Sequence, residues 1–234
     1  MIMGVDLETY SSVDLQKAGV RPYTEAPDFT ILLISYRVDG QPTRIIDLAD
    51  SEDVDPSLLP PVLSDLPAGD TDEFLCLLTS PEVVKTAYNA SFERTCLARY
   101  FARLMPPEQW RCTMVQAATL GLPGTLAQVG AALGLEKQKL TEGAELIRYF
   151  CKPAKDGTRH YPKDAPDKWE RFRKYNVRDV DVETDIRDRL ARWPRPPAEL
   201  AAWELDQRIN DRGVRLDAGL LDKALELDGQ YSAR

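Results

Sequence analysis

The chain has 234 residues, of which 43% are hydrophobic and 29% charged, with a formal net charge of −8. These proportions are ordinary for a globular protein and exclude collagen-like and wholly disordered chains. The best apolar run, residues 31–36, is far shorter than the roughly 20 residues of a membrane-spanning helix. The N-terminal MIMGVDLETY has no basic region before an apolar core. We therefore expect no signal peptide, no membrane partner and a cytoplasmic location.

The rarest residue types limit the available chemistry. A single histidine, His160, excludes Ser-His-Asp relays, HExxH metalloprotease sites and multi-histidine zinc sites. Cys76, Cys96, Cys112 and Cys151 form no CxxC pair, which favours reduced thiols over a zinc ribbon. Catalysis, if present, is therefore left to the 38 Asp and Glu residues.

The charge is unevenly distributed along the chain. Residues 148–174 hold nine basic and four acidic residues, whereas residues 1–147 hold 21 acidic and 11 basic ones. The basic residues of this segment are Arg148, Lys152, Lys155, Arg159, Lys163, Lys168, Arg171, Arg173 and Lys174. Such a segment can contact phosphates or form a solvated loop, and its composition alone leaves both open.

Strand patterns come early in the chain and helical patterns come late. Strands are predicted at 1–9, 31–38, 44–48, 83–88 and 111–114, with Asp39-Gly40 forming a tight turn. Helices are predicted at 72–78, 91–104, 115–120, 125–133, 142–150 and 167–192, and irregular chain at 51–69 and 152–166. In 91–104 the core-facing residues are Leu97, Tyr100, Phe101 and Leu104. This order predicts an α/β fold with a mixed sheet flanked by helices.

A proline-rich segment at 194–197 separates a short C-terminal part. Helical patterns at 198–211 and 220–227 follow it without completing a core. We therefore predict one domain at 1–196 and a helical connection at 197–234 that begins something larger.

Two acidic residues share one face of the first predicted strand. Because side chains alternate, Asp6 and Glu8 lie about 6–7 Å apart while Leu7 points away. Paired carboxylates can bind a hard divalent cation, but Asp-x-Glu is also common on exposed strands.

A third acid interrupts an apolar stripe on the helix predicted at 167–192. Tyr175 and Asp179 are four residues apart and therefore share a face. The stripe consists of Phe172, Tyr175, Asp179, Val182, Ile186 and Leu190. A buried acid needs a partner, either a metal ion or an arginine. The neighbouring acids Asp181, Glu183, Asp185 and Asp188 are predicted to be solvated.

Glu93 lies in the first turn of another predicted helix, four residues after Asn89. The helix dipole favours an acid there. An asparagine at this point can cap the helix. Both residues therefore have simple structural explanations when each is taken by itself.

Taken together, these residues form a recognisable pattern. VDLET (5–9), YNASFE (88–93) and YNVRD (175–179) resemble, in order and approximate spacing, the three motifs of the 3′→5′ exonucleases of the DEDD superfamily, tyrosine branch. The segments LETYSSVDL, NASFERTCL, WRCTM, LGLEKQKLTEG and LDQRINDRGVRLD resemble the N-terminal proofreading domain of phage-type family A DNA polymerases. This resemblance covers nearly the whole chain and implies an RNase H-like fold.

The resemblance implies metal-dependent release of nucleoside 5′-monophosphates from the 3′ end of single-stranded DNA. Two divalent cations, Mg²⁺ or Mn²⁺, are implied, the first held by Asp6, Glu8 and Asp179 and the second by Asp6 with Glu93 in its outer shell. Tyr175 is implied to orient the attacking water, because its ordinary pKa near 10 makes it a poor base.

The resemblance also implies substrate contacts. Thr9 and Asn89 match positions that contact the 3′-terminal nucleotides. Glu93 departs from the family pattern, which has Asp there, and we expect activity to survive this change. His160 is expected to be a loop residue, because Lys174 stands five positions before Asp179, where the histidine branch needs its base.

The leading hypothesis is therefore a proofreading exonuclease domain, acting as a monomer, with a polymerase domain in a longer chain. No polymerase motif is present, so we expect no polymerase activity. A stand-alone exonuclease similar to RNase D, acting on RNA or DNA, is the second hypothesis. A non-catalytic RNase H-like nucleic-acid-binding scaffold is the third.

Overall fold

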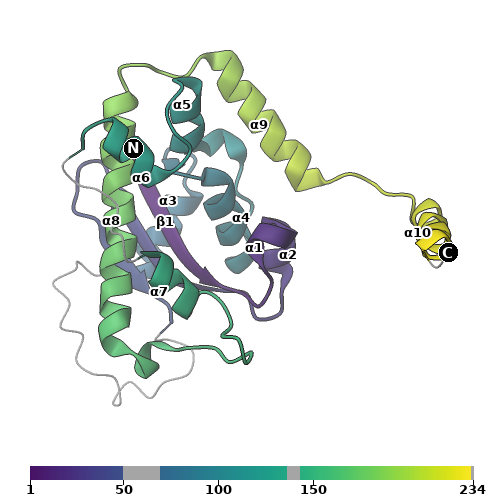
Figure 1. Ribbon diagram of the computed structural model, residues 1–234. Coiled ribbons are helices and arrows are strands. Elements are labelled where there is room, and N and C mark those ends of the chain that lie inside the picture. The colour runs from purple at the N-terminus through teal and green to yellow at the C-terminus, as the bar shows by residue number, and fades with distance from the viewer. Residues whose placement is uncertain (50–68, 136–142, 233–234) are drawn as a thin grey trace. The chain divides into compact units, whose positions relative to one another are not determined.

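A five-stranded mixed sheet forms the centre of the unit Met1–Arg195 (Figure 1). The computed structural model describes residues 1–49, 69–135 and 143–232. The strands are β1 (Ile2–Tyr10), β2 (Thr30–Val38), β3 (Arg44–Asp47), β4 (Val84–Ala87) and β5 (Trp110–Cys112), in the order β3-β2-β1-β4-β5. β1–β2 and β2–β3 are antiparallel, while β1–β4 and β4–β5 are parallel. The predicted mixed α/β fold is confirmed.

Helices cover both faces of this sheet. They are α1 (Leu15–Ala18), α2 (Val20–Glu25), α3 (Thr71–Thr79), α4 (Ala90–Tyr100), α5 (Thr113–Thr119), α6 (Leu126–Ala132), α7 (Gly143–Phe150) and α8 (Pro166–Leu190). In Figure 1 the long helix α8 runs beside β1, to its left, and α3 and α4 lie farther from the viewer. A 3₁₀ turn at Pro162–Asp164 interrupts the loop predicted at 152–166. Apart from Gly69, the loop predicted at 51–69 lies outside the described residues.

The strand register assigns the acids to one face of the sheet. Asp6 lies opposite Ser35 and Glu8 opposite Leu33, so these four side chains point the same way. Leu33 packs in a cluster with aromatic residues of α8, which places Asp6 and Glu8 on the α8 face. On the opposite face Tyr36 packs against Phe74 of α3, with ring centroids 5.2 Å apart.

Helix α4 is shorter than predicted. It ends at Tyr100, and Leu104 is 93% exposed instead of facing the core. Ala102 has a φ of +49°, a left-handed conformation that cannot continue an α-helix. Leu97, one turn earlier, is fully buried as predicted.

The chain divides into two compact units, Met1–Arg195 and Pro196–Arg234. The second contains α9 (Pro197–Arg212) and α10 (Ala218–Ser232). Among its described residues, α10 has no buried side chain, and it exposes Leu220, Leu221, Leu225, Leu227 and Tyr231. The assignment of 197–234 to a connection remains a prediction. Within the described parts of both units, no helix is long and apolar enough to cross a membrane.

Candidate active site

One pocket brings the predicted site residues together. Its volume is about 630 Å³, and it lies at the carboxyl ends of the parallel strands β1 and β4. Ligands commonly bind at this edge of a sheet. All seven predicted residues line it: Asp6, Glu8, Thr9, Asn89, Glu93, Tyr175 and Asp179. Three segments far apart in the sequence therefore supply one constellation.

Strand β1 supplies two carboxylates whose neighbours come from the α7–α8 side. The Asn176 amide of α8 donates a hydrogen bond to Asp6 Oδ2 at 2.6 Å. Glu8 is 6% exposed, and the Cys151 thiol lies 3.7 Å from its Oε2. A register irregularity follows Glu8, where Thr9 pairs with Ile31. Such irregularities change the direction of side chains next to active sites.

Helix α8 supplies Tyr175 and Asp179 from successive turns. Both are buried, at 1% and 5% exposed. Burial is the main cause that raises the pKa of Tyr175 far above its ordinary value, followed by the negative charges of Glu8, Asp179 and Asp6. A hydrogen bond with Asp179 adds to this shift. The phenol therefore stays protonated at neutral pH and serves as a hydrogen-bond donor.

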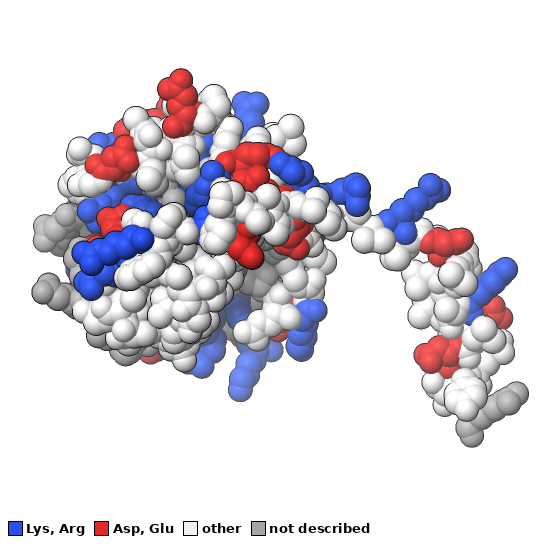
Figure 2. Space-filling model, turned by 90° about the horizontal axis from the view of Figure 1, so that it is seen from above, with Lys and Arg blue, Asp and Glu red and all other residues white. Residues whose placement is uncertain are grey.

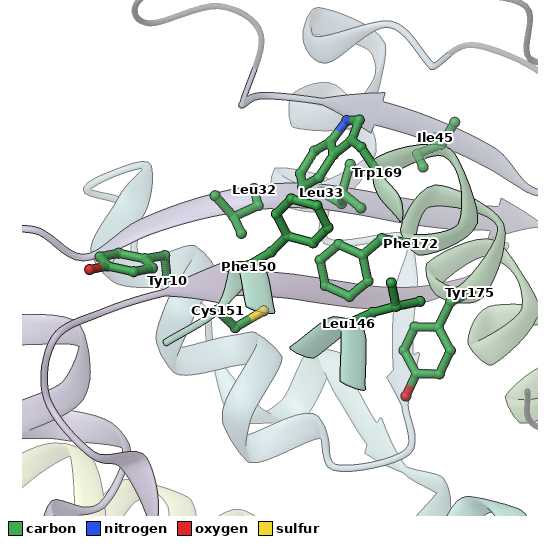
Figure 3. Packing of buried hydrophobic residues seen from close by; sticks show 10 residues of the cluster. All are labelled: Tyr10, Leu32, Leu33, Ile45, Leu146, Phe150, Cys151, Trp169, Phe172 and Tyr175. Carbon is green, nitrogen blue, oxygen red and sulfur yellow. The ribbon is translucent and has the colours of Figure 1, made fainter. Parts of the chain in front are cut away.

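The Tyr175 ring belongs to a hydrophobic cluster in which α7 and α8 pack against strands β1, β2 and β3 (Figure 3). Its ring is stacked on Phe172 with centroids 6.1 Å apart and an interplanar angle of 15°. In Figure 3 its hydroxyl points away from the Phe150 and Phe172 rings. The core thus holds the ring while the pocket receives its polar end.

Helix α4 supplies the fourth carboxylate. Glu93 is 5% exposed in the first turn of α4, and burial raises its pKa well above the usual value, with the charge of Asp6 the next cause. Asn89 is exposed at the start of α4. Asn89 is the N-cap residue of α4, as the capping explanation expects, but within the described residues its side chain makes no capping hydrogen bond.

Thr9 is held in place by a residue that the sequence did not indicate. Its hydroxyl and that of Tyr23, from α2, are 2.7 Å apart in a buried hydrogen bond. Tyr23 also lines the pocket and packs against Phe92, with ring centroids 6.3 Å apart. Thr9 therefore faces the pocket with a fixed orientation.

The donor set of the pocket suits a hard divalent cation. Four carboxylates converge on it, and Glu93 Oε2 is buried with no hydrogen-bond partner among the described residues. Hard cations prefer such oxygen ligands and offset the repulsion from Asp6, which adds to burial in raising the pKa of Glu93. In the described part of the chain, no group of three or more Asp, Glu, His or Cys side chains is arranged so that it could hold a metal ion. The residues fit such an ion in chemistry and burial.

The basic segment 148–174 borders the pocket at one point. Lys152 and Pro153 line the pocket, while the Arg159 guanidinium lies 4.2 Å above the Tyr10 ring. His160 stacks on Tyr149 at 4.0 Å between ring centroids. On the face seen in Figure 2, basic and acidic side chains are interspersed.

The structure contradicts the prediction for one acid of α8. Glu183, expected to be solvated, is 3% exposed. The Thr113 hydroxyl donates to its Oε1, and Arg187 Nη1 lies 3.9 Å from its Oε2. Donors supplied by other elements make this burial tolerable, and no local pattern on α8 indicates them.

The site geometry is built on an RNase H-like α/β fold, and the comparisons with solved structures agree. Escherichia coli RNase D, an exoribonuclease, matches with a TM-score of 0.50 and 16% identity, over 92% of this chain and 46% of that one. Brucella melitensis NrnC matches in a form with bound Mg²⁺ (TM-score 0.50, 13% identity, 91% of this chain and 86% of that one). The form bound to pGG matches with a TM-score of 0.52 and 13% identity, over 91% and 85%. These likenesses concern the fold.

The sequence itself has a much nearer relative. This chain is 48% identical over 239 residues to the DNA polymerase of Bacillus phage SP02, and the alignment covers 99% of this chain and 34% of the polymerase. The resemblance to a phage DNA polymerase is therefore confirmed, and the chain spans about a third of that protein's length. No protein-family model matches the sequence.

Proposed function

We propose that this chain is a metal-dependent 3′→5′ exonuclease domain that proofreads for a DNA polymerase. The observation that carries the proposal is the single pocket in which four carboxylates and Tyr175 meet. The reaction is hydrolysis of the 3′-terminal phosphodiester of single-stranded DNA, which releases nucleoside 5′-monophosphates. We infer a polymerase domain in a longer chain and a location in the cytoplasm of a bacterium or phage-infected host, and the similarity to a phage DNA polymerase supports the polymerase context.

Asp6, Glu8 and Asp179 would hold one divalent cation, Mg²⁺ or Mn²⁺. Asp6 with Glu93 in the outer shell would hold a second. Bound cations of this kind lower the pKa of a water molecule and stabilise a leaving oxygen. The donor chemistry and the buried Glu93 oxygen support this assignment.

The protein's own groups position the reactants. The Tyr175 phenol stays protonated, so it orients the attacking water by a hydrogen bond and does not remove its proton. Thr9 and Asn89 would contact the terminal nucleotide, which the hydrogen bond between Thr9 and Tyr23 and the exposure of Asn89 support. Lys152, which lines the pocket, would contact a phosphate of the incoming strand and make binding salt-dependent.

The direct test is a 5′-labelled single-stranded DNA incubated with Mg²⁺ or Mn²⁺. We expect a ladder that shortens from the 3′ end and is abolished by EDTA and by Asp6→Ala. If the oligonucleotide stays intact with both metals, the result contradicts the exonuclease and favours the hypothesis of a non-catalytic scaffold. Gel filtration of the same sample tests the expected monomer.

A second candidate is an exoribonuclease like RNase D, supported by the shared fold. The phage relative favours DNA because its identity is 48%, against 16% for RNase D. Matched DNA and RNA oligonucleotides of one sequence separate the two. Faster digestion of RNA would favour the second candidate.

A further inference from the structure

Gly143, the first residue of α7, lies against the Tyr175 ring. A Cβ atom built on Gly143 would lie 2.1 Å from Tyr175 Cε2, 2.4 Å from Cζ and 2.8 Å from the hydroxyl oxygen. Real Cβ contacts are essentially never shorter than 3.0 Å. The hydroxyl end of the ring therefore occupies the space that any other residue at position 143 would fill.

The surrounding packing restricts movement of the Tyr175 ring away from position 143. Phe172, stacked on one side, is fully buried, and Leu146 of the same cluster is 1% exposed. Such interiors are close-packed, so an inserted methyl group forces side chains or backbone to move. An ordinary contact would require the ring to move by about 1 Å or more, because Cβ contacts normally begin near 3.4 Å.

Helix α7 is equally constrained. Leu146 and Phe150 anchor it in the cluster that holds Tyr175, and Phe150 is 1% exposed (Figure 3). Shifting α7 away from the ring would open the contacts of both residues. Moving the Tyr175 hydroxyl costs less, because that end of the ring faces the pocket.

We propose that Gly143 is a positioning residue for the nuclease reaction: its missing side chain provides the space that fixes the Tyr175 hydroxyl beside Asp179. This inference rests on the proposed function for its catalytic consequence. The contact itself is independent of that function. Glycine has no side chain to accommodate, so the close approach of the ring explains why glycine stands at this position.

The test compares Gly143→Ala with Gly130→Ala. Gly130 is also buried in a helix, but its Cβ would meet Val182 Cγ1 at 3.7 Å, an ordinary contact. We expect Gly143→Ala to lower kcat on single-stranded DNA about 100-fold, as misplacement by about 1 Å does, with KM changed less than threefold. Gly130→Ala should keep the wild-type kcat.

Two variants of Tyr175 distinguish an effect of Gly143→Ala on the position of the hydroxyl from an effect on the stability of the fold. Tyr175→Phe keeps the ring atoms that collide but lacks the hydroxyl, and Tyr175→Leu lacks all three colliding atoms. In metal-free buffer, Gly143→Ala should lower the melting temperature by about 2–12 °C in the wild-type and Tyr175→Phe backgrounds, but not with Tyr175→Leu. In the Tyr175→Phe background it should cause no further fall in kcat.

The outcomes distinguish this inference from the proposed function. A wild-type chain that digests no oligonucleotide contradicts the function, while the melting temperatures still test the contact. If the wild type is active and Gly143→Ala keeps at least half of its kcat, the positioning role is wrong. An equal further loss of kcat in the Tyr175→Phe background also contradicts it.

Discussion

Asp179 and Glu183 are two buried acids one turn apart on α8, and their surroundings differ. Asp179 lines the pocket with three other carboxylates and the Tyr175 phenol. Glu183 is not among the residues that line the pocket, and it meets Thr113, Thr86 and Arg187, which supply hydrogen bonds and a positive charge. Both are about equally buried, at 5% and 3% exposed.

The difference shows that burial of an acid does not by itself identify a functional site. A buried carboxylate surrounded by donors and a cation is structural, because the protein supplies its compensation. A buried carboxylate grouped with other carboxylates calls for a positive partner from outside the chain. The following predictions test whether the two acids differ in this way.

The largest expected effect is on catalysis at the pocket. Asp179→Asn should lower the rate of 3′-end digestion by about 10³-fold or more, because a ligand to the cation is lost. Its free energy of unfolding in metal-free buffer should stay unchanged or rise, because one of several converging negative charges is removed. Rates come from the labelled-DNA assay and stability from urea titration.

Asp181→Asn is the matched control for this substitution. Asp181 lies on the same helix, and its carboxylate accepts a hydrogen bond from Thr43 at 2.6 Å outside the pocket. The control should keep the wild-type rate. An Asp179→Asn chain that retains more than a tenth of the wild-type rate would contradict the assignment of Asp179 as a ligand.

The opposite pattern is expected at Glu183. Glu183→Ala leaves the Thr113 hydroxyl without its acceptor and removes the carboxylate that pairs with Arg187, so it should lower the free energy of unfolding by about 3 kcal/mol. The folded fraction should keep its digestion rate within about threefold. Glu183→Gln, which keeps an acceptor oxygen, should cost less. Loss of activity in fully folded Glu183→Gln comparable to that of Asp179→Asn would remove the distinction between the two acids.

A smaller effect on the Mg²⁺ requirement is expected at Asn176, which bonds to Asp6. Asn176 is fully buried, and its amide donates to Asp6 Oδ2. Groups that orient metal ligands typically contribute 10–100-fold to affinity or activity, so Asn176→Ala should raise the half-saturating Mg²⁺ concentration by about that factor. Asn210→Ala, on α9, serves as the control because its side chain bonds the Asp206 carbonyl within the second unit. An unchanged Mg²⁺ requirement for Asn176→Ala would show that Asp6 is oriented without it.

Much of the fold follows from local sequence patterns. Alternation along β1 and the Asp39-Gly40 turn predict the antiparallel part of the sheet, and the 3.6-residue stripe predicts α8. The short helices α1 and α2 were not predicted, because four and six residues are too few to show a period. Asp14, which caps α1 by accepting from two backbone amides, was the available signal.

The candidate site was predictable where spacing carries the information. Separations of two residues on a strand and four on a helix put Asp6 with Glu8 and Tyr175 with Asp179, and the resemblance joined them to Glu93. Their supporting residues depend on contacts over long sequence distances. Asn176 meets Asp6 across 170 positions, and Thr113 meets Glu183 across 70. No local pattern contains such pairs, which is why Glu183 was predicted to be solvated.

The smallest expected effect is a pH dependence of stability at Glu183. Burial is the main cause that raises its pKa above the usual 4.5, although Arg187 and Thr113 oppose the shift. Between pH 4.5 and the raised pKa, the folded chain binds more protons at this site than the unfolded chain. The free energy of unfolding of the wild type should therefore fall, relative to Glu183→Gln, as pH rises through this window, by up to about 1.4 kcal/mol per pH unit. Urea titrations of both proteins from about pH 4.5 to 7.5 measure the difference, in which the other titrating groups cancel. A difference that stays constant with pH would mean that the pKa of Glu183 is the same in the folded and unfolded chains, so that the surrounding donors compensate the burial of the charge completely.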